Sequence, residues 1–196
     1  MNCHLQKGKR NEIAFVFSCP GEKEENEGKP AAGITGNNLS ELLKLLNKKL
    51  VSWELSREQI TITNVWTKIE YKNKTNRTEA DDNEIISSDN LKRLREELII
   101  IEDLIIYSGK KAMLGVCQIQ CNLNKHCQII YIEHLGTRGL NNIKNDVNGK
   151  EILAASKQLE NGDSRSLKEI QNNNTFKRLE IICQNIAEQL KNKKEL

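Results

Sequence analysis

The chain has 196 residues, of which 37% are hydrophobic and 29% are charged, and its formal net charge is +3. This length lies near the upper end of the ~100 to 200 residues of one compact domain, so we expect a single domain over residues 1–196. No apolar run approaches the ~18 to 20 residues of a membrane span, and the first ten residues lack the apolar core of a secretory signal. We therefore expect a cytoplasmic, monomeric protein with no membrane contact.

Six cysteines are expected to be free thiols, because the cytosol is reducing. They are Cys3, Cys19, Cys117, Cys121, Cys127 and Cys183. The spacing of the group formed by Cys117, Cys121, His126 and Cys127 matches none of the common zinc signatures. We therefore predict neither a metal site nor a cofactor.

The first half of the chain alternates between strand and helix patterns. Residues 13–18 (IAFVFS) form an apolar run rich in β-formers, as in a strand covered on both faces. Residues 38–50 are predicted to be an amphipathic helix, because leucines recur at helical spacing. Residues 60–65 (ITITNV) are predicted to be a second strand.

The same alternation continues to the end of the chain. A polar loop leads to a helix that places Leu91, Leu94, Leu98 and Ile101 on one stripe. Further segments follow in order: a strand at 103–109, a helix at 110–117, a strand at 128–134, a loop at 135–148 and a C-terminal helical segment ending near Leu190. Strands separated by helices imply crossover connections, and hence an α/β fold with a parallel sheet and helices on both faces.

Polar residues follow three of the predicted strands. Glu24 and Glu25 lie shortly after the first strand, Asn64 ends the second, and His134 ends the fourth. Ligands of open parallel sheets bind beyond the carboxyl ends of the strands, so these side chains are expected to converge. An amide can recognise a heteroaromatic edge, an imidazole can stabilise negative charge, and a carboxylate can orient water or stabilise a sugar cation.

Each of these residues also has a purely structural interpretation. Glu24 and Glu25 are interpretable as solvated loop charges, Asn64 as a turn residue at a strand end, and His134 as a structural hydrogen bonder. Their joint placement at three strand ends favours the functional interpretation.

Several motifs, in chain order, resemble those of the uracil-DNA glycosylase superfamily, in particular its family 4. The first motif of that family corresponds here to Pro20, Gly21, Glu24, Glu25, Gly28, Pro30 and Gly36. TNVWTK at 63–68 resembles the Thr-Asn strand end, NRT at 76–78 the following loop, and HLGTRGL at 134–140 the closing His motif. The similarity runs from about residue 13 to residue 143.

The resemblance implies a three-layer α/β/α sandwich with a four-stranded parallel sheet. It also implies a monofunctional DNA glycosylase that hydrolyses the base–sugar bond of a flipped-out nucleotide. Asn64 would bind the base edge, His134 would stabilise the negative charge on the pyrimidine 2-oxygen, and Glu24, or else Glu25, would assist the water or the sugar cation. The substrate-binding residues would be Pro20, Gly21, Glu25, Ala31 and Asn64.

The resemblance also implies contacts with DNA. The loop after His134 would enter the minor groove, which makes Arg138 and Leu140 candidate wedges. Lys68 and Arg77 would contact phosphates, although a solvated loop explains these two cations equally well.

Three departures from the family pattern concern cofactor and catalysis. Family 4 members carry four cysteines that bind an iron–sulfur cluster, but here only Cys3 precedes the first strand, and Lys68 stands where a later cysteine is expected. We therefore expect no cluster. Sister families have an Asp or Asn before the first-motif proline to orient water, and this chain has Cys19. This leaves the water to Glu24 or Glu25.

The base pocket is expected to be unusually large. Uracil-specific members stack the base on an aromatic ring after the motif's second proline, whereas Pro30 is followed here by Ala31 and Ala32. Such stacking is worth ~1 to 3 kcal/mol. Some relatives exclude 5-substituted bases with a Tyr at the place of Gly21. We therefore predict a larger, 5-substituted pyrimidine. The superfamily includes a phage-defence glycosylase that removes glucosylated 5-hydroxymethylcytosine from phage DNA, and the resemblance implies this substrate and this role in anti-phage defence.

Three alternatives remain open from the sequence. Within the enzyme class, the alternative is removal of uracil in base-excision repair. Outside the enzyme class, the alternative is a non-catalytic nucleic-acid-binding module on the same fold. A dinucleotide-binding Rossmann protein is disfavoured, because no G-x-G-x-x-G follows the first strand.

Overall fold

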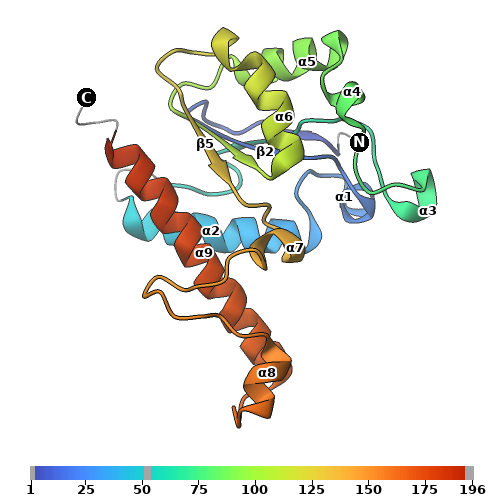
Figure 1. Cartoon of the computed structure of the whole chain (residues 1–196). Helices are drawn as coiled ribbons and strands as arrows, with labels where there is room; N and C mark the ends of the chain where they lie inside the picture. The colour runs from blue at the N-terminus through green and yellow to red at the C-terminus, as the bar shows by residue number, and fades with distance from the viewer. Residues whose placement is uncertain (1–2, 51–53, 193–196) are drawn as a thin grey trace.

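A twisted β-sheet forms the centre of the computed structural model, which describes residues 3–50 and 54–192 (Figure 1). Within these ranges the sheet has five strands in the order β1-β3-β2-β4-β5. They are β1 Leu5–Gln6, β2 Ile13–Phe17, β3 Thr61–Asn64, β4 Leu104–Ser108 and β5 Gln128–Ile132. The four predicted parallel strands are confirmed. The expected count of four is wrong for the whole sheet, because β1 pairs antiparallel with β3. β1 has two residues, too few to produce an alternating pattern.

The helices follow the predicted order, with additional short ones. They are α1 Glu22–Glu27, α2 Gly33–Lys49, α3 Lys72–Thr75, α4 Asp82–Ile85, α5 Ser88–Leu98, α6 Lys110–Ile119, the 3₁₀ helix η1 Gln120–Asn122, α7 Thr137–Leu140, α8 Ala155–Glu160 and α9 Leu167–Asn192. None of the helices in the described ranges is long and apolar enough to cross a membrane.

The acidic segment after β2 is a helix rather than the turn that its composition indicates. Glu24 accepts a hydrogen bond from the backbone N–H of Gly21, which closes the first turn of α1. Gly28 ends the helix with a φ of 67°, in the left-handed region that glycine adopts without steric cost. These caps explain why six residues rich in glutamate form a helix here.

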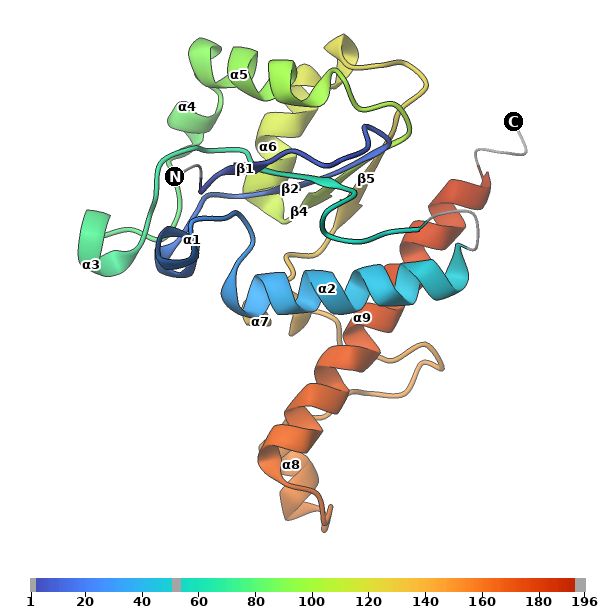
Figure 2. The ribbon, with the colours of Figure 1, turned by 180° about the vertical axis from the view of Figure 1, so that it is seen from behind.

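The direction of the crossovers sets the three layers. The connection through α2 runs from β2 to β3, which lies on one side of β2. The next two connections, through α5 and α6, run to β4 and β5, which lie on the other side of β2. Crossovers between parallel strands are right-handed, so a reversal of direction places the helices on opposite faces. Accordingly α2 and α9 cover one face, and α5 and α6 cover the other (Figures 1 and 2).

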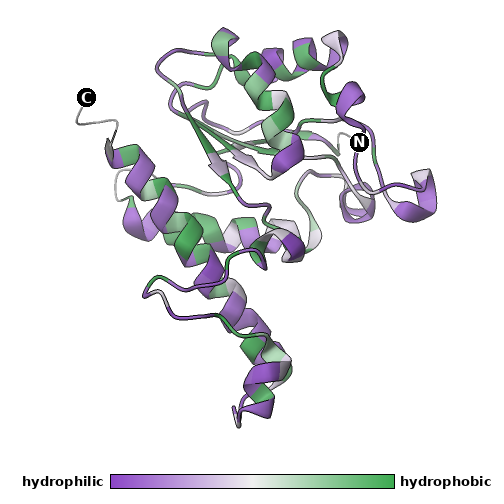
Figure 3. Cartoon of the chain, in the orientation of Figure 1, coloured by the Kyte–Doolittle hydropathy of each residue, from purple (hydrophilic) through white to green (hydrophobic). Residues whose placement is uncertain are grey.

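Both faces of the central strand are buried. Ile13, Phe15 and Phe17 of β2 join the core beneath α2 and α9, while Ala14 and Val16 join the core beneath α5 and α6. Successive strand residues point to opposite faces, which explains why β2 is apolar throughout. Figure 3 shows the apolar colour concentrated in the strands and on the helices that pack against them. The sheet is therefore a rigid platform whose carboxyl edge carries the polar strand ends.

Candidate active site

A cavity of about 450 Å³ lies at the carboxyl edge of the sheet. This volume falls within the ~300 to 1,000 Å³ typical of small-molecule sites. The cavity also lies where the crossovers reverse direction, which is the usual ligand position in open α/β sheets. Its lining comes from β2 and the following turn, β3, the segment before α4, the start of α2, and the loop after β5. The residues are Phe17, Ser18, Cys19, Gly21, Glu24, Ala31, Thr35, Asn64, Glu70, Thr78, Glu79, His134, Gly136, Thr137, Arg138 and Gly139.

Asn64, the last residue of β3, lines this cavity and has an unpartnered amide oxygen. The residue is 2% exposed, and its Oδ1 is buried without a hydrogen-bond partner among the described residues. Its backbone is held on both sides: its N–H donates to the carbonyl of His4 at 2.9 Å, and Arg93 donates to its carbonyl at 3.0 Å. Buried polar atoms are nearly always paired, so this oxygen is available to a ligand that carries a donor.

His134 follows β5 and is held in one tautomer. The backbone N–H of Gly136 donates to its Nδ1 at 2.9 Å, so Nδ1 is unprotonated and the neutral ring carries its proton on Nε2. Burial lowers the pKa of His134, and the nearby charges of Glu79 and Glu24 oppose that effect. Near neutral pH the ring is therefore an uncharged donor through Nε2.

Three glycines surround the imidazole closely. A Cβ added at Gly109 would lie 3.1 Å from the Cβ of His134. A Cβ added at Gly136 would lie 2.8 Å from Nδ1 of the ring. A Cβ at Gly139 would lie 2.1 Å from the carbonyl oxygen of His134. A side chain at Gly136 or Gly139 would therefore force His134 or its backbone to shift, whereas the contact at Gly109 is tight but tolerable.

Glu24 lines the cavity, but both of its carboxylate oxygens are bound. Oε2 accepts from the N–H of Gly21 at 2.9 Å, and Oε1 accepts from the N–H of Ala32 at 2.8 Å. Glu24 therefore joins the first turn of α1 to the start of α2. Ala31, between these elements, has a φ of 47°, which is rare for an alanine. The guanidinium of Arg57 donates to its carbonyl at 3.0 Å and holds the segment in place.

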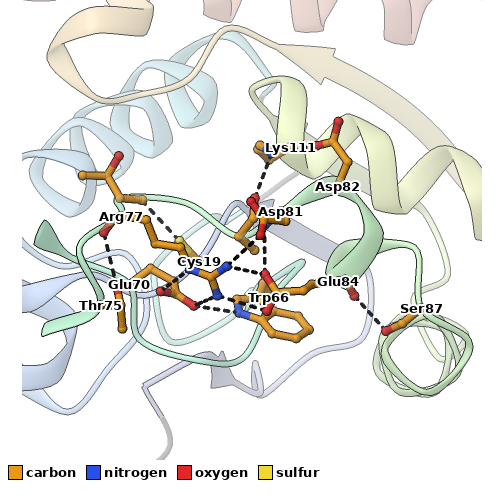
Figure 4. Close-up of polar contacts among 12 residues, drawn as sticks. Cys19, Trp66, Glu70, Thr75, Arg77, Asp81, Asp82, Glu84, Ser87 and Lys111 are labelled. Atoms are coloured by element: carbon orange, nitrogen blue, oxygen red, sulfur yellow. Dashed lines mark hydrogen bonds and ion pairs between the residues drawn. The ribbon is translucent and has the colours of Figure 1, made fainter.

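Glu70 also lines the cavity and is held by a network of polar contacts (Figure 4). Glu70 is 3% exposed, and Arg77 donates to both of its oxygens, at 2.5 and 2.8 Å. The indole N–H of Trp66 donates to the same carboxylate at 3.2 Å. These hydrogen bonds, that of Arg77 above all, lower the pKa of Glu70 to about 2. Arg77 also pairs with Glu84 and Asp81, so its donors are occupied within the protein.

Cys19 lines the cavity as a neutral thiol. Burial, the largest cause, raises the pKa of Cys19 to about 11, and the charges of Glu79 and Glu70 act in the same direction. Its Sγ donates to the carbonyl of Thr78 at 3.6 Å. The thiol is therefore protonated at neutral pH and does not act as a base or a nucleophile there.

The structure brings six of the predicted site residues together in the cavity lining: Gly21, Glu24, Ala31, Asn64, His134 and Arg138. Five others lie outside that lining. Pro20 is buried, and its carbonyl accepts from the N–H of Glu70. Glu25 pairs with Lys74 and with the hydroxyl of Tyr71, which lowers the pKa of Glu25.

The remaining three outside the lining are predicted DNA contacts. The ammonium of Lys68 lies 5.4 Å above the ring of Trp66. Arg77 is bound within the ion-pair network of Figure 4. Leu140 is 2% exposed and packs in the core beneath α2 and α9, so in this conformation it is not a wedge.

Sequence reasoning missed two acidic residues of the lining, Glu70 and Glu79. Both lie in the polar segment between β3 and α4, where no hydrophobic period indicates which side chains face inward. The signal available for Glu79 was its position directly after the NRT motif at 76–78.

The residues do not fit a four-cysteine iron–sulfur cluster. Lys68, at the place of one expected ligand, has no sulfur to bind iron, and its ammonium lies over the ring of Trp66. In the described part of the chain, no group of three or more His, Cys, Asp or Glu side chains is arranged to hold a metal ion.

This chain is similar to several known proteins. A model of the Uracil DNA glycosylase superfamily matches residues 8–160. The type-4 uracil-DNA glycosylase of Saccharolobus solfataricus is 38% identical over 73 residues, which cover 32% of this chain and 31% of that protein. The match thus spans less than a third of that relative. The NMR structure of a candidate uracil DNA glycosylase from Methanosarcina acetivorans covers 90% of this chain and 95% of its own, with 13% identity and a TM-score of 0.42. Because the family model matches most of its length, this chain belongs to the uracil DNA glycosylase superfamily.

Proposed function

We propose that this protein is a monofunctional DNA glycosylase that hydrolyses the N-glycosidic bond of a flipped-out, modified pyrimidine and leaves an abasic site. The observation that carries the proposal is the buried, unpartnered Oδ1 of Asn64 in the same cavity as His134, whose tautomer is set for donation. Family membership supports the same reaction class.

The amide of Asn64 is proposed to recognise the Watson–Crick edge of the base. Its orphan oxygen is an acceptor, and both the exocyclic amine of cytosine and the ring N–H of uracil supply a donor. The hydrogen bond would relieve a buried polar group, which costs ~1 to 3 kcal/mol when it is left unpaired. Base binding thus offsets part of the few kcal/mol needed to extrude a nucleotide from the stack.

His134 and Glu24 are proposed to stabilise the charges that develop as the bond breaks. The Nε2–H of His134 would donate to the pyrimidine 2-oxygen, where negative charge grows. The carboxylate of Glu24, fixed by two backbone N–H groups, would stabilise the positive charge on the sugar. The cavity lining contains no lysine, so it offers no amine for a covalent imine with the sugar. This supports hydrolysis alone.

The cavity is proposed to accept a base larger than uracil, specifically glucosylated 5-hydroxymethylcytosine. Gly21 and Ala31 line it with small side chains, and the hydroxyls of Thr35, Thr78 and Thr137 offer hydrogen-bonding groups for a sugar. A protein with this specificity would act in the cytoplasm as a monomer against phage DNA that carries the modification.

DNA contacts are proposed to centre on Arg138. This residue lines the cavity beside His134, is exposed, and makes no ion pair with the described residues. Its guanidinium is free to follow a phosphate or to enter the minor groove. Lys68 is proposed as a second phosphate contact.

The test compares three duplex DNAs: glucosylated phage DNA, the same sequence unmodified, and a uracil-containing duplex. Free base and abasic sites are measured after incubation with the protein. Release from glucosylated DNA alone is expected. Release of uracil alone would support a repair enzyme and refute the enlarged pocket, whereas binding without release from any duplex would support a non-catalytic module.

A size variant sharpens this test. Ala31→Phe would place a ring into the cavity at the position where uracil-specific members have one. We expect release of the glucosylated base to fall sharply while the protein stays folded. The left-handed φ of Ala31 adds a strain of roughly 1 to 2 kcal/mol, so folding is checked by thermal unfolding.

A further inference from the structure

We propose that Glu79 is the carboxylate that orients and deprotonates the attacking water. This inference rests on the proposed glycosylase function and assigns its water-handling step to a residue outside the first family motif. It follows from how the three carboxylates that line the cavity, Glu24, Glu70 and Glu79, are used by the protein.

Two of these carboxylates are held in place by hydrogen bonds within the protein. Glu24 accepts one backbone N–H on each oxygen, and these bonds join α1 to α2. Glu70 accepts both arms of Arg77 and the indole N–H of Trp66. A carboxylate that holds fixed donors in this way is an electrostatic or structural group, and moving it would leave buried donors unpaired.

Glu79 differs from both. Its side chain makes no hydrogen bond and no ion pair with any residue in the described ranges 3–50 and 54–192, although it lies in the cavity lining. The residue is exposed, so solvent reaches its oxygens directly. A solvent-exposed carboxylate in the cavity lining, with no partner among the described residues, has the properties that water activation requires.

Its electrostatic neighbours place Glu79 close to the reacting groups. The charge of Glu79 acts more strongly on His134 than that of Glu24 does, and more strongly on Cys19 than that of Glu70 does. Cys19 stands where sister families have an Asp or Asn that orients water. The protonated thiol of Cys19 cannot accept a proton there, and Glu79 supplies the missing carboxylate from another segment of the chain.

The step balances without any further reactant. The bond from C1′ of the sugar to the base nitrogen breaks, and its electron pair leaves with the base, whose 2-oxygen accepts the hydrogen bond from His134. The oxygen of water forms the new bond to C1′, and one water proton passes to the carboxylate of Glu79. That proton is then released to the departing base anion or to solvent.

The experiment measures single-turnover base release at saturating enzyme, together with the enzyme concentration that gives half of the maximal rate. Glu79→Gln is expected to lower the maximal rate by ~100-fold or more, because general bases contribute ~10² to 10⁴-fold. The half-saturating concentration should stay unchanged. The matched control is Glu22→Gln, which removes an exposed carboxylate outside the cavity lining and should leave both quantities unchanged.

Chemical rescue separates proton transfer from a structural role. Glu79→Ala should regain part of its rate in added formate, which supplies a small carboxylate in the vacated space, whereas wild type should not respond. If wild type releases base and Glu79→Gln does so at the same maximal rate, the assignment is wrong. A variant that loses affinity but keeps the rate would make Glu79 a recognition residue instead. If wild type releases no base from any duplex, the proposed function itself fails.

Discussion

Two parts of the cavity wall contain similar residues but use their polar atoms differently. We call Asn64, His134 and Glu79 the open wall, because the amide oxygen, one ring nitrogen and the carboxylate have no partner among the described residues. We call Glu24 and Glu70 the closed wall, because their carboxylates are bound to backbone N–H groups or to Arg77 behind the wall. Both walls are polar, yet only the open wall is available to a ligand.

This difference separates reactivity from stability within one site. Donors and acceptors that are paired inside the protein contribute to folding, and a ligand can use them only by breaking those bonds. Unpaired groups do not stabilise the fold, and a ligand can use them without breaking a bond inside the protein. Variants of the open wall should therefore change base release, and variants of the closed wall should change stability first.

The largest expected effect is on the open wall. His134→Ala removes the donor to the 2-oxygen and should lower the single-turnover rate of base release by ~10² to 10³-fold. Thermal unfolding should change little, because the ring accepts only one backbone hydrogen bond. The control is His126→Ala, an exposed histidine outside the cavity lining, which should keep full activity. Equal loss in both variants would contradict the comparison.

The rate should also fall in acid. The pKa of His134 is lowered by burial, so the neutral donor persists somewhat below the ordinary value of about 6.5 and is lost as the pH falls further. The low-pH loss of rate, measured on the folded enzyme, should therefore lie below the ordinary histidine range. A rate that rises as His134 becomes charged would contradict a neutral donor.

The next effect is on the closed wall. Glu70→Ala leaves the indole N–H of Trp66 unpaired and removes both hydrogen bonds to Arg77, so it should cost about 2 kcal/mol of unfolding free energy. Urea unfolding measures this loss. Glu96→Ala, an exposed glutamate on α5, is the control. If Glu70→Ala abolished release without destabilisation, Glu70 would belong to the open wall.

The ion pair of Glu70 with Arg77 also predicts that the stability of the fold depends on pH. The folded-state pKa of Glu70 is about 2, below its ordinary value of about 4.5, so its contribution to stability is complete above the ordinary value. That contribution is lost as the pH falls from about 4.5 towards about 2, because the unfolded chain binds the proton first. The difference in stability between wild type and Glu70→Ala should therefore shrink over this window.

A smaller effect tests how the open wall is positioned. Gly136→Ala would place a Cβ 2.8 Å from Nδ1 of His134 while the backbone φ of −74° accepts alanine. The ring must shift by a few tenths of an ångström, and we expect a loss of rate of ~10-fold, since small misplacements at a reacting centre are costly. Gly149→Ala has nothing within 4 Å of the added Cβ, but its φ of 78° strains alanine, so it should lower stability and leave the rate unchanged.

The smallest effect concerns DNA affinity. Arg138→Ala should weaken DNA binding by a few-fold at low salt and reduce the salt slope by about 1, because one phosphate contact is lost. Lys125→Ala, at the amino end of β5 and away from the cavity, is the matched control. An unchanged slope for Arg138→Ala would move the DNA contact elsewhere.

The sequence by itself determined the sheet and the strand-end residues. Apolar runs such as 13–17 can be buried only as strands covered on both faces, and the residues that follow them must meet at one edge. The convergence of Asn64 and His134 was therefore predictable from chain order alone. The two-residue β1 was not, since it is too short to carry a period.

Only the tertiary structure decided which polar atoms are free. Arg77 and Glu70 are ordinary charged residues in the sequence, and their pairing depends on how the segment between β3 and α4 folds back on Pro20. Leu140 enters the core rather than solvent because α7 packs against α9. Hydrogen bonds between distant segments leave no periodic signal, so the contrast between a bound Glu24 and a free Glu79 exists only in three dimensions.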